Sequence, residues 1–322
     1  MTAPTARTAV AAPQPSSRTA AGGSRDRSVG RALLDLARPG QWHKNVLVLG
    51  APVAGGLLRD PAAMGRAAVM VAAFVAASVA VYATNDVRDA DLDRLHPRKR
   101  HRPVASGRLR SRWAITLSVT AAAVALGLSG LLGAPSVLVV AAYLASSLAY
   151  AFWFKHVAVL DIVLVAGGFA LRALGGAAAT HLAVSNWFLL VTLFGSLCLV
   201  AGKRSAEGRG ADAAPGHPAA AAVTRPVLAQ YPTAWLQQVL TLALTGCFVA
   251  YAMWAFQYVG TDVFHPLLAA SVVPFLIGVL RYGLLVSQGD GEEPERVVLR
   301  DRTLLAAGAV WAGTVVISLY LT

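Results

Sequence analysis

The residues best suited to chemistry form a short acidic run, 85–93 (Asn-Asp-Val-Arg-Asp-Ala-Asp-Leu-Asp), directly after an apolar segment. If a helix continues through this run, Asp86, Asp89 and Asp93 are spaced i, i+3 and i+7 and share one helical face. Asn85 lies one turn before Asp89 and can add an amide oxygen. Clustered oxygen ligands suit Mg²⁺, which commonly carries substrate phosphates. The spacing therefore predicts a Mg²⁺ site formed by Asn85, Asp86, Asp89 and Asp93, whose three carboxylates are the candidate catalytic residues.

A solvated helix end is the alternative interpretation of this run, with Arg88 and Arg94 forming local salt bridges to the acids. Four carboxylates in nine residues at the mouth of a membrane helix are costly unless something pairs with them, which favours a binding site. Asp91 points away from the shared face, and we expect it to contribute little.

A basic run follows the acids, Arg98-Lys99-Arg100-His101-Arg102, between Pro97 and Pro103. Because proline interrupts helices, we expect the run to fold back over the acids, where Lys99 and Arg102 would reach a phosphate. The same charges can also set membrane topology or contact anionic lipids, and this alternative stays open.

The other candidates lie at the ends of further apolar segments. Lys203, Arg204 and Glu207 open a second long polar loop, and Asp161 lies about one turn into an apolar segment. An acid inside a membrane segment is a functional candidate by default, although a structural pair of Asp161 with Lys155 or Arg172 is the alternative. The predicted substrate-binding residues are Gln41, Lys44, Asn85, Lys99, Arg102, Tyr150, Lys155, Asp161, Lys203, Arg204 and Glu207.

The composition indicates an all-α polytopic membrane protein. Of 322 residues, 56% are hydrophobic and only 14% charged, which is too apolar for a soluble globular domain. A span needs about 20 apolar residues. Nine segments qualify, at about 44–60, 65–84, 112–131, 134–154, 158–180, 185–202, 234–257, 263–286 and 302–321.

The charge distribution predicts the orientation of the chain. Its net charge of +12 is confined between apolar segments, which favours membrane topology over nucleic-acid binding. With the N-terminus in the cytoplasm, the outside loops hold only Arg59 and Arg66 of the basic residues. Residues 1–30 contain no apolar signal-peptide core, so we expect a disordered cytoplasmic tail followed by a membrane domain at 31–322. The acidic run then faces the cytoplasm.

The acidic run resembles the Asn-Asp-x-x-Asp-x-x-x-Asp motif of the UbiA superfamily of membrane prenyltransferases. Three further stretches resemble its phosphoribosyltransferase branch, which acts on decaprenyl phosphate: 38–45 (Arg-Pro-Gly-Gln-Trp-His-Lys-Asn), 96–103 (His-Pro-Arg-Lys-Arg-His-Arg-Pro) and 201–207 (Ala-Gly-Lys-Arg-Ser-Ala-Glu). The resemblance covers about residues 31 to 322 and implies a UbiA-type helix bundle in the plasma membrane. The chain departs from many superfamily members in lacking a second Asp-x-x-x-Asp cluster, because Asp212 is the only acid soon after Glu207.

The resemblance implies a Mg²⁺-dependent transfer of 5-phosphoribose from phosphoribosyl pyrophosphate to decaprenyl or another polyprenyl phosphate, releasing pyrophosphate, for precursors of cell-wall arabinan. The acceptor is already an anion, so no general base is needed. One alternative is a prenyltransferase that joins a prenyl pyrophosphate to an aromatic acceptor, and another is a transporter or lipid flippase. No partner other than the membrane and these substrates is implied, and a homo-oligomer is compatible with the sequence.

Overall fold

The structure is a computed structural model, and it describes residues 21–97, 99–212, 226–257, 266–290 and 294–321. Within these ranges every regular element is an α-helix or a 3₁₀ helix, which confirms the predicted all-α fold. In chain order the elements are α1 (Ala21–Ala37), η1 (Pro39–Leu49), α2 (Gly50–Ala54), η2 (Leu57–Arg59), α3 (Pro61–Arg88), α4 (Ala90–Leu95), η3 (Lys99–His101), α5 (Ser111–Gly130), α6 (Ala134–Phe152), η4 (Phe154–His156), α7 (Leu160–Thr180), α8 (Asn186–Asp212), η5 (Pro226–Gln230), α10 (Thr233–Gln257), α11 (Pro266–Ala270), α12 (Val272–Gln288), α13 (Pro294–Arg300) and α14 (Arg302–Tyr320).

Eight segments of the described chain are long and apolar enough to cross a membrane: α3, α5, α6, α7, α8 through Glu207, α10, α11 with α12, and α14. The predicted count of nine is not confirmed. The first predicted span, 44–60, is not one α-helix but η1, α2 and η2 in succession. Its irregularity has a physical reason, because Gly50, Pro52, Gly55 and Gly56 lie within it, and Gly56 adopts a left-handed conformation at φ 76°.

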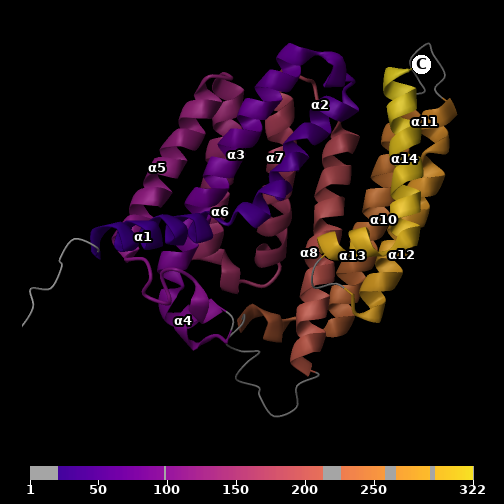
Figure 1. Ribbon diagram of the computed structural model, residues 1–322. Coiled ribbons are helices and arrows are strands. Elements are labelled where there is room, and N and C mark those ends of the chain that lie inside the picture. Colours follow the sequence, from indigo (N-terminus) through magenta and orange to yellow (C-terminus); the bar gives the residue numbers. More distant parts are fainter. Residues whose placement is uncertain (1–20, 98, 213–225, 258–265, 291–293, 322) are drawn as a thin grey trace, which may run out of the picture.

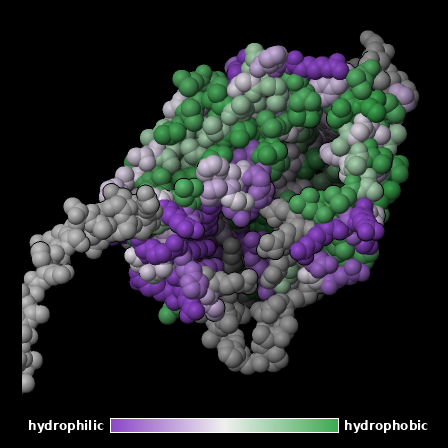
Figure 2. Space-filling model, viewed as in Figure 1, coloured by the Kyte–Doolittle hydropathy of each residue, from purple (hydrophilic) through white to green (hydrophobic). Residues whose placement is uncertain are grey.

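The long helices form one bundle, in which each helix packs against at least one other. Helices α3, α5, α6 and α7 pack together on one side of Figure 1, α10, α12 and α14 on the other, and α8 contacts both α7 and α10. Hydrophobic side chains cover the flanks of the bundle, whereas hydrophilic ones gather at the end that holds α4 and α13 (Figure 2). This distribution is the one expected of a bundle whose flanks face lipid.

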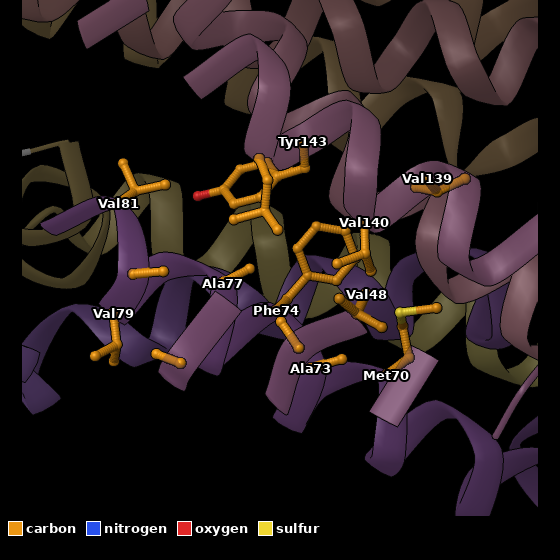
Figure 3. Close-up of a cluster of buried hydrophobic side chains, with 14 of the residues drawn as sticks. Val48, Met70, Ala73, Phe74, Ala77, Val79, Val81, Val139, Val140 and Tyr143 are labelled. Carbon is orange, nitrogen blue, oxygen red and sulfur yellow. The ribbon is translucent and has the colours of Figure 1, made fainter. Parts of the chain in front are cut away.

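The core beside α3 combines large and small side chains (Figure 3). The rings of Phe74 and Tyr143 meet edge to face, with their centroids 5.3 Å apart. Helix α7 approaches this layer through glycines. A Cβ on Gly176 would lie 1.7 Å from the Val48 carbonyl oxygen, and one on Gly175 would lie 2.4 Å from the Phe74 ring. The lack of a side chain at these two positions explains how the irregular η1 segment and Phe74 fit against α7.

A buried arginine ties η1 to the bundle. Arg172, on α7, is 6% exposed and donates from Nε to Asn45 Oδ1 at 2.8 Å and from Nη2 to the Tyr143 hydroxyl at 2.8 Å. A third bond, from Nη1, reaches the Gly168 carbonyl at 2.9 Å. These partners are neutral, so the predicted alternative of an Arg172–Asp161 pair is wrong. Arg172 instead positions η1 against α6 and α7.

Helix α1 lies across the end of the bundle that holds α4 (Figure 1). Its Ala32 and Leu36 are buried against Ala83 at the end of α3 and Ala114 at the start of α5. The predicted domain boundary at residue 30 therefore falls inside a helix, because α1 begins at Ala21; residues 1–20 of the predicted tail lie outside the described residues. The helix ends at Ala37, which places the next residue, Arg38, beside the acidic run.

Candidate active site

The acidic run is located where α3 ends and α4 begins. Asp89 caps α3 with φ −93° and ψ 5°, and its carbonyl accepts from the Asp93 N–H at 2.8 Å, so the chain keeps a nearly helical course through the break. Asp86 and Asp93 are 1% and 4% exposed, whereas Asp91 is exposed and pairs with Arg94. The helical spacing thus predicted correctly that Asp86 and Asp93 turn inward and that Asp91 faces away; the Asp89 side chain is 26% exposed.

Each inward acid is paired with a cation from a different part of the chain. Arg38 Nη2 donates to Asp86 Oδ1 at 2.5 Å. Arg102 Nη1 lies 2.7 Å from Asp93 Oδ2 and 3.6 Å from Asp86 Oδ1, so one guanidinium bridges two carboxylates. Lys155 Nζ contacts Asp89 Oδ1. Three cations therefore neutralise the three acids, and Arg102 contacts two of them.

The basic run folds back over the acids, as the two prolines predicted. Helix α4 ends at Leu95, residues 99–101 form the short helix η3, and the following turn brings Arg102 to Asp93. Buried Val104 and Leu109 anchor the turn in the apolar layer beneath α1. Arg98 lies outside the described residues.

The residue types fit a divalent metal, and one atom supports this directly. Asp86 Oδ2 is buried and has no hydrogen-bond partner. A buried carboxylate oxygen left without a partner is costly, so an additional ligand for it is expected. Within the described residues, no three acidic, histidine or cysteine side chains converge on a common point. In this conformation Asp86, Asp89 and Asp93 are thus suitable ligands that do not yet share a centre.

A second polar cluster joins α7, α8 and η5. Asp161 is fully buried, and Arg204 Nε donates to its Oδ2 at 3.1 Å. Arg204 Nη1 also lies 3.1 Å from Glu207 Oε2, and Arg204 interacts electrostatically with Tyr150. This places four predicted residues together and shows that Asp161 pairs with Arg204, not with Lys155.

Tyr231 completes the second cluster. Its hydroxyl donates to Asp161 Oδ1 and accepts from the Val159 N–H at 2.7 Å. Burial, followed by the hydrogen bond to Asp161, raises the pKa of Tyr231 above its ordinary value. The hydroxyl therefore stays protonated at neutral pH, which is the form that can donate to Asp161.

One short segment, residues 153–160, connects the two clusters. It supplies Lys155 to Asp89, and it leads through Val159 to Asp161. Val159 has φ 69°, a conformation that costs a β-branched residue on the order of 1–3 kcal/mol. The N–H of Val159 donates to the Tyr231 hydroxyl, so this turn contacts the second cluster while Lys155, four residues earlier, contacts the first.

The remaining predicted residues are less tightly placed. Asn85 is half-buried on the last turn of α3, Lys44 is half-buried on η1, and Lys99 is half-buried on η3. Lys203 is exposed on α8, directly before Arg204. Gln41 is exposed on η1, and its backbone N–H donates to the Arg38 carbonyl at 2.8 Å; no side-chain contact brings it to the acids.

Two residues of these clusters were not predicted as site residues. Arg38 lies within the stretch 38–45 that resembles the phosphoribosyltransferase branch, and its position just before Pro39 could have drawn attention to it. Tyr231 has no such signal, because an isolated tyrosine between a polar loop and an apolar segment resembles an interfacial anchor.

The model of the UbiA prenyltransferase family matches residues 47–318. The chain belongs to the UbiA prenyltransferase family. Together with its apolar helices, this makes it a multi-pass membrane protein. It is 40% identical over 282 residues to a decaprenyl-phosphate phosphoribosyltransferase of Mycobacterium tuberculosis, covering 86% of this chain and 91% of that one. It is 38% identical over 295 residues to the protein of the same name from Corynebacterium glutamicum, covering 90% and 87%.

Solved structures show the same fold at much lower identity. A UbiA homologue from Archaeoglobus fulgidus, bound to DMAPP and Mg²⁺, superimposes with a TM-score of 0.67 at 16% identity, covering 89% of this chain and 97% of that one. The same homologue bound to GPP and Mg²⁺ gives a TM-score of 0.65 at 17% identity, covering 89% and 98%. At this identity the likeness shows the fold alone.

Proposed function

We propose that the chain transfers 5-phosphoribose from phosphoribosyl pyrophosphate to a polyprenyl phosphate, with decaprenyl phosphate as the expected acceptor. The relatives named decaprenyl-phosphate phosphoribosyltransferase, which match over most of both chains, support this reaction. The structural observation that carries it is the set of cations placed directly on the acids of the motif, namely Arg38, Arg102 and Lys155. A donor with three phosphate groups requires this density of positive charge.

The donor would be held from two sides. Arg38, Arg102 and Lys155 contact the acids at the α3–α4 break, and Lys203 is exposed on α8 directly before Arg204. Guanidinium groups suit the paired oxygens of a phosphate, whereas an ammonium acts as a compact point charge. Arg204 is almost fully buried between Asp161 and Glu207, so it serves this site by positioning the end of α8.

Asp86, Asp89 and Asp93, with Asn85 beside them, would hold a Mg²⁺ ion. The unpartnered Oδ2 of Asp86 supports this assignment, and the Mg²⁺ named with the two Archaeoglobus complexes agrees with it. When bound, the ion supplies neutralisation of the charge that develops on departing pyrophosphate.

The reaction needs no proton transfer. An oxygen of the lipid phosphate forms a bond to the anomeric carbon of the ribose, and the bond from that carbon to pyrophosphate breaks. The leaving pyrophosphate keeps the electron pair, and attack in line with departure inverts the anomeric carbon. The role of the protein is to hold both anions together and to stabilise the leaving charge. This accounts for a site built from acids and cations.

The site would face the cytoplasm of a cell whose plasma membrane holds the bundle. The excess of basic residues in the loops at the α4 end supports this orientation through the positive-inside rule. A water-soluble sugar pyrophosphate then reaches the acids from the cytoplasm, and the lipid acceptor reaches them from the membrane.

A prenyl transfer to an aromatic acceptor is the second candidate, and the fold supports it because the Archaeoglobus homologue was solved with prenyl pyrophosphates. It requires less positive charge, since a prenyl pyrophosphate carries two phosphate groups rather than three.

Purified protein in detergent should be given Mg²⁺ and either phosphoribosyl pyrophosphate with polyprenyl phosphate, or a prenyl pyrophosphate with aromatic acids. We expect pyrophosphate release with the first pair only. Release of pyrophosphate with the second pair alone would show that the chain is a prenyltransferase and would disprove the proposal.

A further inference from the structure

Arg38 holds an unusual place in the first cluster. It directly follows α1 and adopts a left-handed conformation, with φ 51° and ψ 62°, which is uncommon for a residue other than glycine. This conformation aims the guanidinium at Asp86 Oδ1, 2.5 Å away, and stacks it over the Tyr82 ring at 5.1 Å. A strained backbone at such a position is retained where the contact it permits has a use.

The carboxylate of Asp86 is only half engaged by this contact. Oδ1 has Arg38 at 2.5 Å and Arg102 at 3.6 Å, while the buried Oδ2 has no partner. Asp89 and Asp93 are likewise each bound at one oxygen by a cation. A divalent ion that enters without an anion therefore meets three positively charged side chains, each already in contact with one of the carboxylates that would bind the ion. Their repulsion, which is least screened around the buried Asp86, opposes binding of the bare ion.

The cations that oppose a bare metal would favour a metal that brings its own anion. The Arg38 side chain is 28% exposed, and that of Arg102 is 27% exposed, so both can move toward a ligand at the mouth of the site. If pyrophosphate enters with the metal, both kinds of side chain can change partners together. Each guanidinium leaves its carboxylate and binds a phosphate oxygen, and the carboxylate that is released binds the metal. Every charged group then has a partner of opposite charge in the loaded site as well as in the empty one.

We propose that Arg38, assisted by Arg102, is a resident counter-ion of the acidic motif that makes metal binding and pyrophosphate binding depend on each other. In the empty site Arg38 forms an ion pair with Asp86, and in the loaded site it binds the pyrophosphate group. The inference deepens the proposed function and rests on it only for the identity of the leaving group. It assigns Arg38 a positioning and binding role that neither the acidic motif nor the fold specifies.

Linkage makes the proposal quantitative. If pyrophosphate raises the affinity for the metal, the metal must raise the affinity for pyrophosphate by the same factor. We expect this factor to be on the order of tenfold, within the range that coupled sites usually show. Removing the Arg38 charge should strengthen binding of the bare metal and reduce the coupling factor, since Asp86 is then released and one phosphate contact is lost.

The test is equilibrium dialysis of the purified full chain in detergent, with radiolabelled Mn²⁺ and radiolabelled inorganic pyrophosphate. Both labels are counted on the two sides of the dialysis membrane. Each label is measured alone and then with the other. Wild-type protein should retain little Mn²⁺ alone and about equal amounts of both labels together. Arg38→Gln should retain more Mn²⁺ alone, by several-fold, and show a smaller gain from pyrophosphate.

The matched control is Arg281→Gln. Arg281 lies on α12 and pairs with Asp301 at 2.7 Å, away from the acidic motif. It should bind both labels as wild type does. Arg38→Lys keeps the positive charge and should bind bare Mn²⁺ as weakly as the wild type does, which distinguishes loss of charge from damage to the fold; a normal elution profile and melting temperature are required of every variant.

Two results would overturn the proposal: Mn²⁺ bound equally well with and without pyrophosphate in the wild type, or weaker binding of bare Mn²⁺ in Arg38→Gln than in the wild type. Because the probes are Mn²⁺ and inorganic pyrophosphate, the outcome does not depend on which group the enzyme transfers. A chain that shows the coupling but no phosphoribosyl transfer would disprove the proposed function alone.

Discussion

The buried pair between Arg204 and Asp161 allows one prediction to be worked out in energy. The two groups are 3.1 Å apart, and their side chains are 3% and 0% exposed. At an effective dielectric constant of about 20, two unit charges at this separation attract by about 5 kcal/mol. Removing one member of such a pair leaves the other charge buried and unpaired, which costs about 3–5 kcal/mol. Arg204→Gln should therefore lower the free energy of unfolding by about that amount.

The double variant separates the pair from its surroundings. Asp161→Asn keeps an oxygen that can accept from the Tyr231 hydroxyl. Asp161→Asn with Arg204→Gln removes both charges and leaves none unpaired between these two positions. We expect the double variant to lose less unfolding free energy than the two single variants lose together. The difference should be about 2 kcal/mol or more.

The assay is a reversible unfolding titration in mixed detergent micelles, followed by tryptophan fluorescence, for the wild type, both single variants and the double variant. Asp91→Asn serves as the control, because Asp91 and its partner Arg94 are both exposed and such pairs contribute little. Additive losses, or a loss under about 1 kcal/mol in Arg204→Gln, would refute the claim that this pair fixes α8 against α7.

Three further predictions concern the acids, the lysine of α8 and the packing of η1. Asp86→Asn should abolish turnover while Asp91→Asn retains most of it, since Asp86 is a buried candidate ligand and Asp91 is exposed; equal losses in kcat would contradict this assignment. Lys203→Ala should raise the donor KM more than tenfold, and Lys203→Arg should also be impaired, because a guanidinium does not replace the point contact of an ammonium. Unchanged kinetics in correctly inserted protein would mean that Lys203 only helps to set the membrane topology. Gly176→Ala should lower the melting temperature sharply, because its Cβ would lie 1.7 Å from the Val48 carbonyl oxygen, whereas Gly167→Ala, with open space, should not.

Much of the fold follows from patterns that the sequence displays openly. Long apolar segments predict helices, and their bounds agree with α3, α5, α6, α7, α10 and α14 to within a few residues. Residues 44–60 show where this reasoning ends. Their apolar content suggested a span, but the glycines and Pro52 favour irregular turns, and a tertiary contact, the close approach of Val48 to Gly176, determines their conformation.

The site shows a similar division. Helical periodicity predicted that Asp86 and Asp93 turn inward and that Asp91 does not, because those residues are local neighbours on one helix. The ion pairs could not be predicted this way. Arg38 reaches Asp86 across 48 residues, and Tyr231 reaches Asp161 across 70, so both contacts depend on how α1 and η5 pack on the bundle.

The central claim is that the site transfers a phosphoribosyl group from its pyrophosphate to a lipid phosphate. It is tested most directly with phosphoribosyl pyrophosphate that carries one label in the ribose and another in the pyrophosphate, incubated with the purified protein, Mg²⁺ and decaprenyl phosphate. The ribose label should enter the lipid phase while an equal amount of the second label leaves as pyrophosphate, and neither should occur without the lipid acceptor. Pyrophosphate label in the lipid, or release that does not require the lipid, would contradict it.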